Sequence, residues 1–114
     1  MTTIAGSSRY LLHARAALTN EICRIQDLMR DITESHTMDE KIFFMRVLFE
    51  YLRSNHLYLC QHVGFRLAIL EKIKFARHIS RDRRYQMNPH MIRMLIAISD
   101  VEKLIREKPI KGAF

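Results

Sequence analysis

The sequence predicts an all-α protein: a bundle of about four helices in one domain over residues 1–108, followed by a short tail at residues 109–114. Only 3 Gly and 2 Pro occur in 114 residues, so the chain lacks the many turns that a β-sandwich or β-barrel needs. Hydrophobic residues make up 48% of the chain, which is too many for a disordered or low-complexity protein. They recur every three or four positions, which is the spacing of one face of a helix.

Composition also indicates the environment and the partners. No apolar run approaches the roughly 20 residues that cross a membrane as a helix, so we expect no membrane contact. The start of the chain does not resemble a secretory signal, and 2 Cys cannot form a disulfide scaffold, so we expect a reducing intracellular compartment. The net charge of +7 favours an acidic partner, either nucleic acid or an acidic protein surface.

The first predicted helix starts near Ser7 or Ser8, because either side chain can cap a helix N-terminus. Its hydrophobic residues form one narrow stripe, as in the seam of a helical bundle or coiled coil. The stripe consists of Leu11, Leu18, Ile22, Ile25, Met29 and Ile32. A break over residues 33–37 separates this helix from the next.

The second helix is predicted to lie at the centre of the bundle. Thr37 and Glu40 have the spacing of a capping box, which marks the start of a helix. Residues 42–51 are hydrophobic on nearly every side of a helix, and such a helix is buried on most sides. A strand is the alternative for so short an apolar run, but the capping box favours a helix.

The third helix carries hydrophobic residues at helical spacing from Leu59 to Ile73 and ends near His78. Whether it continues the second helix through residues 54–55 stays open. Gly64 lies inside this pattern, where a glycine costs about 1 kcal/mol relative to alanine. We interpret it as a place where another helix approaches closely.

The fourth helix follows a polar loop at residues 80–86. Asn88 at the N-cap and Pro89 at the first helical position open it in the usual way. Pro109 ends it.

No local pattern points to an enzyme, a metal site or a cofactor. His56 and Cys60 lie four residues apart, but no second pair has the spacing of metal ligands. A Cys–His nucleophile pair would meet only in the fold, and nothing local supports one. The glycines are isolated, so no phosphate-binding loop occurs, and no two acids pair on an apolar face. We therefore expect a non-catalytic protein without a cofactor.

A cluster of basic residues lies between the third and fourth helices, with Asp82 as the one acid among them. The cluster consists of Lys72, Lys74, Arg77, Arg81, Arg83 and Arg84. Three interpretations stay open. The cluster contacts phosphates, with Tyr85 as a stacking side chain; it is a helix C-terminus where cations are favourable, followed by a solvated loop; or it docks on an acidic protein.

The second helix has more hydrophobic surface than a four-helix domain of this size can cover. Exposed apolar surface marks a protein interface, so we expect an obligate subunit of an oligomer. The predicted interface consists of Phe43, Phe44, Val47, Phe49, Leu59, Val63, Leu67 and Leu70.

Residues 50–106 resemble the helical domain of the Psf-one subunit of the GINS replication complex. That family has an Asn, an Arg eleven positions later and an aromatic residue twenty positions later, and Asn55, Arg66 and Phe75 stand at these offsets. A second part of the family pattern, after a loop, is matched in order by Pro89, Ile92, Arg93, Met94, Ala97, Asp100 and Glu102.

The chain also departs from the family pattern. His56 and Leu57 replace a basic pair, His62 replaces a Tyr, and Phe75 replaces the usual Trp. The family has a small β-rich domain after its helices, which residues 1–114 do not include.

The resemblance implies a non-catalytic role in DNA replication in the nucleus. The chain would pack with paralogous helical subunits into a tetramer that joins the replicative helicase, with Asn55, Arg66, Phe75 and Arg93 added to the interface. One alternative is a cytoplasmic basic helical protein that binds nucleic acid, or regulates a partner, through residues 72–84. Another is a homodimer built on the stripe of the first helix.

Overall fold

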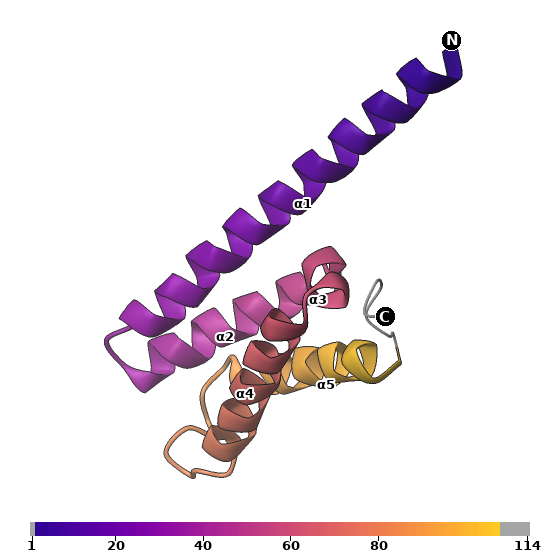
Figure 1. The fold of residues 1–114 in the computed structure, drawn as a ribbon. Helices are drawn as coiled ribbons and strands as arrows, with labels where there is room; N and C mark the ends of the chain where they lie inside the picture. Colours follow the sequence, from indigo (N-terminus) through magenta and orange to yellow (C-terminus); the bar gives the residue numbers. More distant parts are fainter. Residues whose placement is uncertain (1, 108–114) are drawn as a thin grey trace.

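The computed structural model describes residues 2–107 of the chain, and the side chains of residues 12–107. Within residues 2–107 it contains helices and no strand, which confirms the all-α prediction. The helices are α1 (Thr2–Glu34), α2 (Met38–Leu52), α3 (Leu57–Gln61), α4 (Val63–Ser80) and α5 (Met91–Glu107) (Figure 1). The predicted tail and the predicted stop at Pro109 lie outside the described residues. No helix in the described part of the chain has both the length and the hydrophobicity to span a membrane.

Helix α2 lies at the centre, as predicted. It packs against α1 on one side and α5 on the other, α4 packs across α5, and the short α3 connects to both α1 and α4 (Figure 1). The side chains of α2 that form the middle of the core are fully buried, and they are Ile42, Met45, Leu48, Phe49 and Leu52. The hydrophobic pattern around α2 therefore arises because two helices cover it.

Helix α1 differs from the prediction in its start and in its buried face. It begins at Thr2, so Ser7 and Ser8 lie within the helix and neither begins it. Its buried hydrophobic residues are Ile25, Leu28 and Ile32, whereas Ile22 and Met29 of the predicted stripe are half-buried. The N-terminal half of α1 extends past the other helices (Figure 1), and the molecule measures 63 × 27 × 20 Å.

The start of α2 confirms the predicted capping box. The Thr37 hydroxyl accepts a hydrogen bond from the Glu40 N–H at 3.1 Å, and the Glu40 carboxylate accepts one from the His36 N–H at 3.0 Å. The strand alternative is therefore wrong. Helix α2 ends at Leu52, and the Asn55 side chain donates to the Tyr51 carbonyl at 3.0 Å. The second and third predicted segments are separate helices.

The third predicted segment is two helices, because the chain is extended at His62. The His62 Nδ1 accepts a hydrogen bond from the Phe65 N–H at 3.1 Å and so caps the start of α4. A Cβ at Gly64 would lie 3.1 Å from Cε1 of His62. The close approach at Gly64 therefore comes from the capping ring of His62, and the interpretation that another helix lies there is wrong.

The connection to α5 is a series of turns over residues 81–90. The Asn88 side-chain oxygen accepts from the His90 N–H at 2.8 Å, and its nitrogen donates to Asp39 at 2.8 Å. Helix α5 begins at Met91, so Asn88 and Pro89 form the turn before the helix and do not occupy its N-cap and first position.

Candidate interaction surfaces

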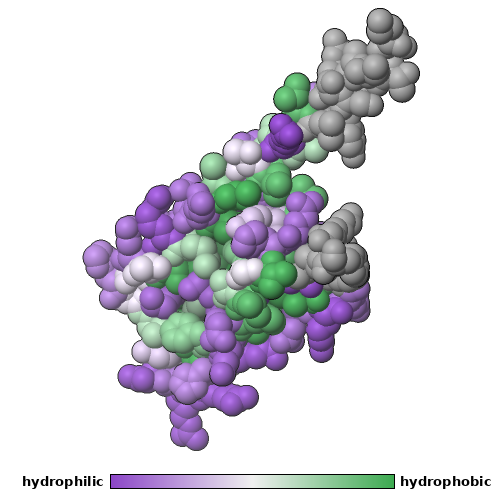
Figure 2. Space-filling view, viewed as in Figure 1, coloured by the Kyte–Doolittle hydropathy of each residue, from purple (hydrophilic) through white to green (hydrophobic). Residues whose placement is uncertain are grey.

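The outer face of α4 exposes a row of hydrophobic side chains. Val63, Leu67 and Leu70 are 52%, 58% and 37% exposed, and their spacing places them on one face of the helix. The opposite face, with Phe65 and Ile69, is buried in the core. Figure 2 shows hydrophobic side chains gathered over α4 on the face in view. We call Val63, Leu67 and Leu70 the α4 row.

A shallow groove lies between α1 and the α3–α4 pair. It has a volume of about 280 Å³ and is lined by Ile22, Ile25, Gln26, Met29, Tyr58 and Phe65. All but one of these side chains are hydrophobic or aromatic. Ile22 and Met29, which belong to the predicted α1 stripe, are half-buried and line this groove. Part of the stripe therefore faces the groove and not the core.

The free half of α1 continues this uncovered surface. Every side chain from residue 12 to residue 17 is exposed, and Leu12 is 65% exposed. Leu18 is half-buried, and Glu21 is the first deeply buried residue of the helix among the described side chains. The side chains of residues 12–17 are thus left largely uncovered by the described part of the chain.

The predicted interface residues of α2 fall into two groups. Phe43, Phe44 and Val47 are half-buried, and the Phe43 ring stacks on those of Phe44 and His90, with centroid distances of 5.4 and 4.9 Å. Phe49 and Leu59, by contrast, are 0% and 1% exposed in the chain's own core. Their assignment to a partner interface is wrong for this fold: α1 and α5 cover Phe49 on α2, and Leu59 lies on α3, which packs against α1 and α4.

The residues that carry the family resemblance mostly hold helix ends in place. Besides the bond of Asn55 to α2, the Arg66 guanidinium donates to the carbonyls of Leu59 at 2.9 Å and Ile105 at 3.4 Å. Arg66 therefore joins α3 and the last turn of α5. Arg93 forms an ion pair with Glu50 at 3.2 Å.

Phe75 is 41% exposed. It lines a depression on α4 with Glu71, Lys74, Arg77, His78 and Arg81. Its ring is therefore accessible from solvent, beside charged side chains.

The basic cluster does not form one patch. Arg77 pairs with Glu102 at 2.9 Å, and Arg84 pairs with Asp82 at 2.7 Å. Hydrogen bonds from Arg84 lower the pKa of the Asp82 carboxyl below its ordinary value. These two arginines are already neutralised within the chain.

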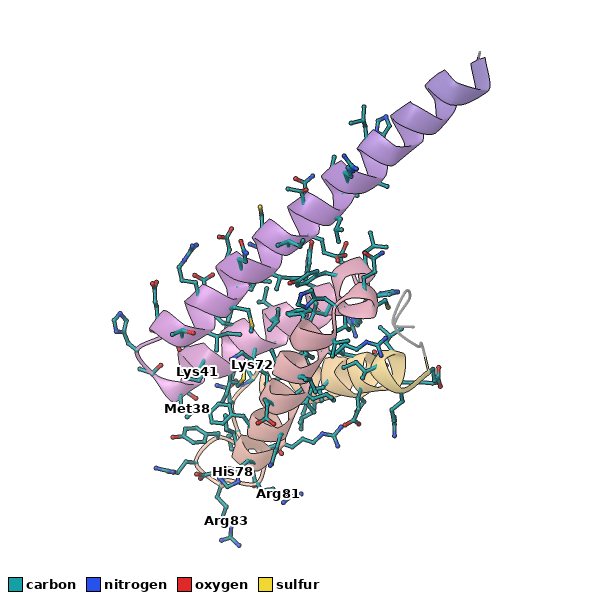
Figure 3. The ribbon with its side chains drawn as sticks, viewed as in Figure 1. Met38, Lys41, Lys72, His78, Arg81 and Arg83 are labelled. Carbon is teal, nitrogen blue, oxygen red and sulfur yellow. The ribbon has the colours of Figure 1, made fainter. Side chains whose placement is uncertain are left out.

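Lys72 is directed away from the rest of the cluster, toward α2. Burial, and after it the charge of Lys41, lowers the pKa of the Lys72 amine. Lys41 lies on α2, and its ammonium donates to the Ile32 carbonyl at the end of α1 at 3.0 Å. Figure 3 shows the two lysines next to each other beside α2, with His78, Arg81 and Arg83 farther along, at the end of α4 and in the loop after it. Sequence reasoning missed Lys41, because only the fold brings it close to Lys72.

Sequence reasoning also missed Glu21. It is 4% exposed, and its carboxylate accepts hydrogen bonds from the backbone N–H groups of Leu57 at 3.3 Å and Tyr58 at 2.6 Å. The available signal was its position: Glu21 stands four residues before Ile25, on the buried face of α1.

The other polar candidates of the sequence form no site together. Within the described side chains, no three His, Cys, Asp or Glu residues come close enough to hold a metal ion. Cys23 is exposed and Cys60 is half-buried, and both are free thiols. Asp100 and Glu102 pair with Arg53 and Arg77.

Comparisons with protein-family models, with curated proteins and with solved structures found no match for this chain.

Proposed function

We propose that the protein is a non-catalytic subunit of a hetero-oligomer of helical proteins, of the GINS type that the resemblance implies. The α4 row carries the proposal: three exposed branched side chains at helical spacing lie directly outside a well-packed core. Because each side chain is already about half-buried, covering the rest of one against a partner would contribute roughly half of the 1.5–3 kcal/mol that full burial gives. An apolar row at helical spacing is the form of surface that a partner helix covers.

The free half of α1 supports the same role. Most helical stability in proteins comes from tertiary packing, and short isolated helices are marginal in water. The side chains of residues 12–17 are all exposed, so they bury little surface against the described chain. A partner that covers this length, together with the groove beside Ile22 and Met29, would supply it.

The resemblance gives the proposal its specific form. Asn55 and Arg66, which carry it, hold helix ends within this chain: Asn55 closes the end of α2, and Arg66 joins α3 to the end of α5. They would therefore contribute a shared fold and not a shared contact. Under this proposal the partners are paralogous helical subunits, the assembly joins the replicative helicase, and the protein acts in the nucleus.

The test is isolation of the full-length tagged chain from its own cell, with partners identified by mass and stoichiometry measured by native mass spectrometry. We expect the wild type in a complex of fixed stoichiometry with other helical subunits and with helicase proteins. Leu67→Glu with Leu70→Glu should remove these partners, because two carboxylates would be buried at the interface.

Met87→Glu is the matched control, because Met87 is a single hydrophobic side chain in the loop and is 90% exposed. This variant should keep the partners. A monomeric wild type without partners would contradict the subunit role, and partners retained by the double variant would contradict the α4 row. A stable complex of helical proteins without replication proteins would support the subunit role and reject its GINS form.

A further inference from the structure

The exposed side of α4 changes from hydrophobic to basic along the helix. Its N-terminal half is the α4 row, and its C-terminal half carries three exposed basic side chains that continue the same helical spacing, Lys74, His78 and Arg81. Val63 and Arg81 are 18 residues apart, which is about five helical turns, so both ends of this series point in the same direction. We call the α4 row together with Lys74, His78 and Arg81 the α4 face.

The basic half of the α4 face has charge that the chain does not neutralise. Lys74, His78 and Arg81 line the depression described above, and Figure 3 shows His78 and Arg81 at this end of α4. No described carboxylate forms an ion pair with Lys74 or Arg81. Glu71 is the one acid that lines the depression, and Arg77 is already paired. Unpaired cations are therefore in excess.

We propose that the α4 face binds a helix of a partner subunit that is hydrophobic along one half and acidic along the other. The inference rests on the proposed function, since it names the chemistry of the partner that covers the α4 row. From Val63 to Arg81 the face is about 27 Å long, so a helix of about 18 residues would cover it. The hydrophobic half of that helix would bury the row, and its carboxylates would face the basic half.

A second copy of this chain does not fit the α4 face. If two copies of α4 packed in parallel, their basic halves would meet and repel each other. If they packed antiparallel, the basic half of each copy would cover the hydrophobic row of the other. Lys74 and Arg81 would then lose water without gaining an acid, which is costly for a charge. The complementary charge must therefore come from a different chain.

The hydrophobic half of the face also favours a protein over nucleic acid. Nucleic acids bind basic surfaces mainly through their phosphates, which would leave the exposed branched side chains of the α4 row uncovered. Protein interfaces combine a hydrophobic centre with a polar rim. Because the hydrophobic and basic halves follow each other on one side of one helix, a single protein segment can cover both.

The test is cross-linking of the complex isolated with the full-length tagged chain, using a carbodiimide that joins an amine directly to a touching carboxylate. Peptide mass spectrometry should find Lys74 joined to acidic residues of one partner segment that also carries hydrophobic residues at helical spacing. Lys72 is the internal control: it lies two residues away but beside Lys41 of α2, so it should not join that segment.

Charge reversal then measures the effect on affinity. Lys74→Glu with Arg81→Glu should raise the dissociation constant for the purified partner roughly 10-fold, and changing the cross-linked carboxylates to lysine should restore it. The matched control is Lys103→Glu with Arg106→Glu, which changes the net charge equally at exposed positions of α5 and should leave the dissociation constant unchanged.

Circular dichroism verifies that each variant is folded. If the reversal lowers the melting temperature, Lys74→Gln with Arg81→Gln takes its place and should still weaken binding roughly threefold.

The outcomes separate this inference from the proposed function. A wild type without partners would contradict the subunit role itself. A complex in which Lys74 joins no partner carboxylate, or in which both reversal variants weaken binding equally, would overturn the inference and leave the subunit role intact. Cross-links from Lys74 to a second copy would assign the face to a homodimer, and loss of the partner on nuclease digestion would assign its basic half to nucleic acid.

Discussion

Glu21 shows how one residue can join two helices, α1 and α3. The first N–H groups of a helix have no partner inside it, and His56 at the N-cap of α3 makes no side-chain cap. The carboxylate of Glu21 on α1 accepts from two of these N–H groups, at Leu57 and Tyr58. A buried acid thus replaces the cap that the local sequence lacks.

Glu21→Ala should lower the free energy of unfolding by about 1–3 kcal/mol, because it leaves the part-buried N–H groups of Leu57 and Tyr58 without this acceptor. Glu21→Gln should cost less, since the amide oxygen still accepts one bond. Urea denaturation followed by circular dichroism measures both. Glu34→Ala is the control on the same helix: its side chain is exposed, and we expect a change within about 0.5 kcal/mol. Equal effects of Glu21→Ala and Glu34→Ala would contradict the role of Glu21.

The charged residues show where sequence reasoning at this scale ends. Charge counts predicted a basic cluster but not which of its members are neutralised. Arg84 finds Asp82 two residues away, whereas Arg77 finds Glu102 on another helix. The Arg84–Asp82 pair joins close neighbours in the sequence and could have been predicted from it. The Arg77–Glu102 pair depends on how α4 packs on α5. The candidate site could therefore be predicted only in part.

At the scale of elements, the start of α4 depends on a histidine and a glycine. His62 caps the helix, its ring stacks on Tyr58 at a centroid distance of 4.9 Å, and Gly64 leaves space for the ring. An alanine at Gly64 would favour the helix by up to about 1 kcal/mol but would press on the capping ring, whose cap contributes about the same.

Gly64→Ala should therefore leave the free energy of unfolding nearly unchanged in the wild type. In a His62→Ala background the same substitution should stabilise the protein by about 1 kcal/mol, because no ring remains to be displaced. Urea denaturation of the two single variants and the double variant gives the coupling energy. Equal effects of Gly64→Ala in both backgrounds would mean that the ring moves aside without loss.

The elements that the sequence predicted well are those with local signals. The capping box at Thr37 predicted the start of α2, and the hydrophobic pattern of α2 predicted its central place. The break between α3 and α4 was missed, because it depends on a His62 side chain that no propensity scale marks as a cap. The buried face of α1 was misassigned by one position, since Ile22 and Met29 match the helical period as well as Leu28 does.

At the scale of the whole molecule, α1 belongs to two environments. From Glu21 onward it packs against α2 and α3, whereas the side chains of residues 12–17 are all exposed. The hydrophobic residues of α1 recur at the same spacing in both halves of the helix. The sequence therefore predicted one continuous hydrophobic stripe, and it did not indicate where the packing stops. Under the proposed function, the outward half is the part of α1 that a partner would cover.

Removal of residues 1–17 separates stability from assembly. Because residues 12–17 are all exposed, the truncated chain should unfold within about 0.5 kcal/mol of the wild type, while losing partners in native mass spectrometry. Removal of residues 1–25 is the contrasting variant: it also deletes Glu21 and the buried Ile25, and should cost several kcal/mol by loss of buried contacts. If the shorter truncation kept every partner, the outward half of α1 would not be a partner surface, and assembly would depend on the α4 row alone. If it destabilised the chain as much as the longer one, the outward half would support the fold itself, and its exposure would no longer argue for a partner.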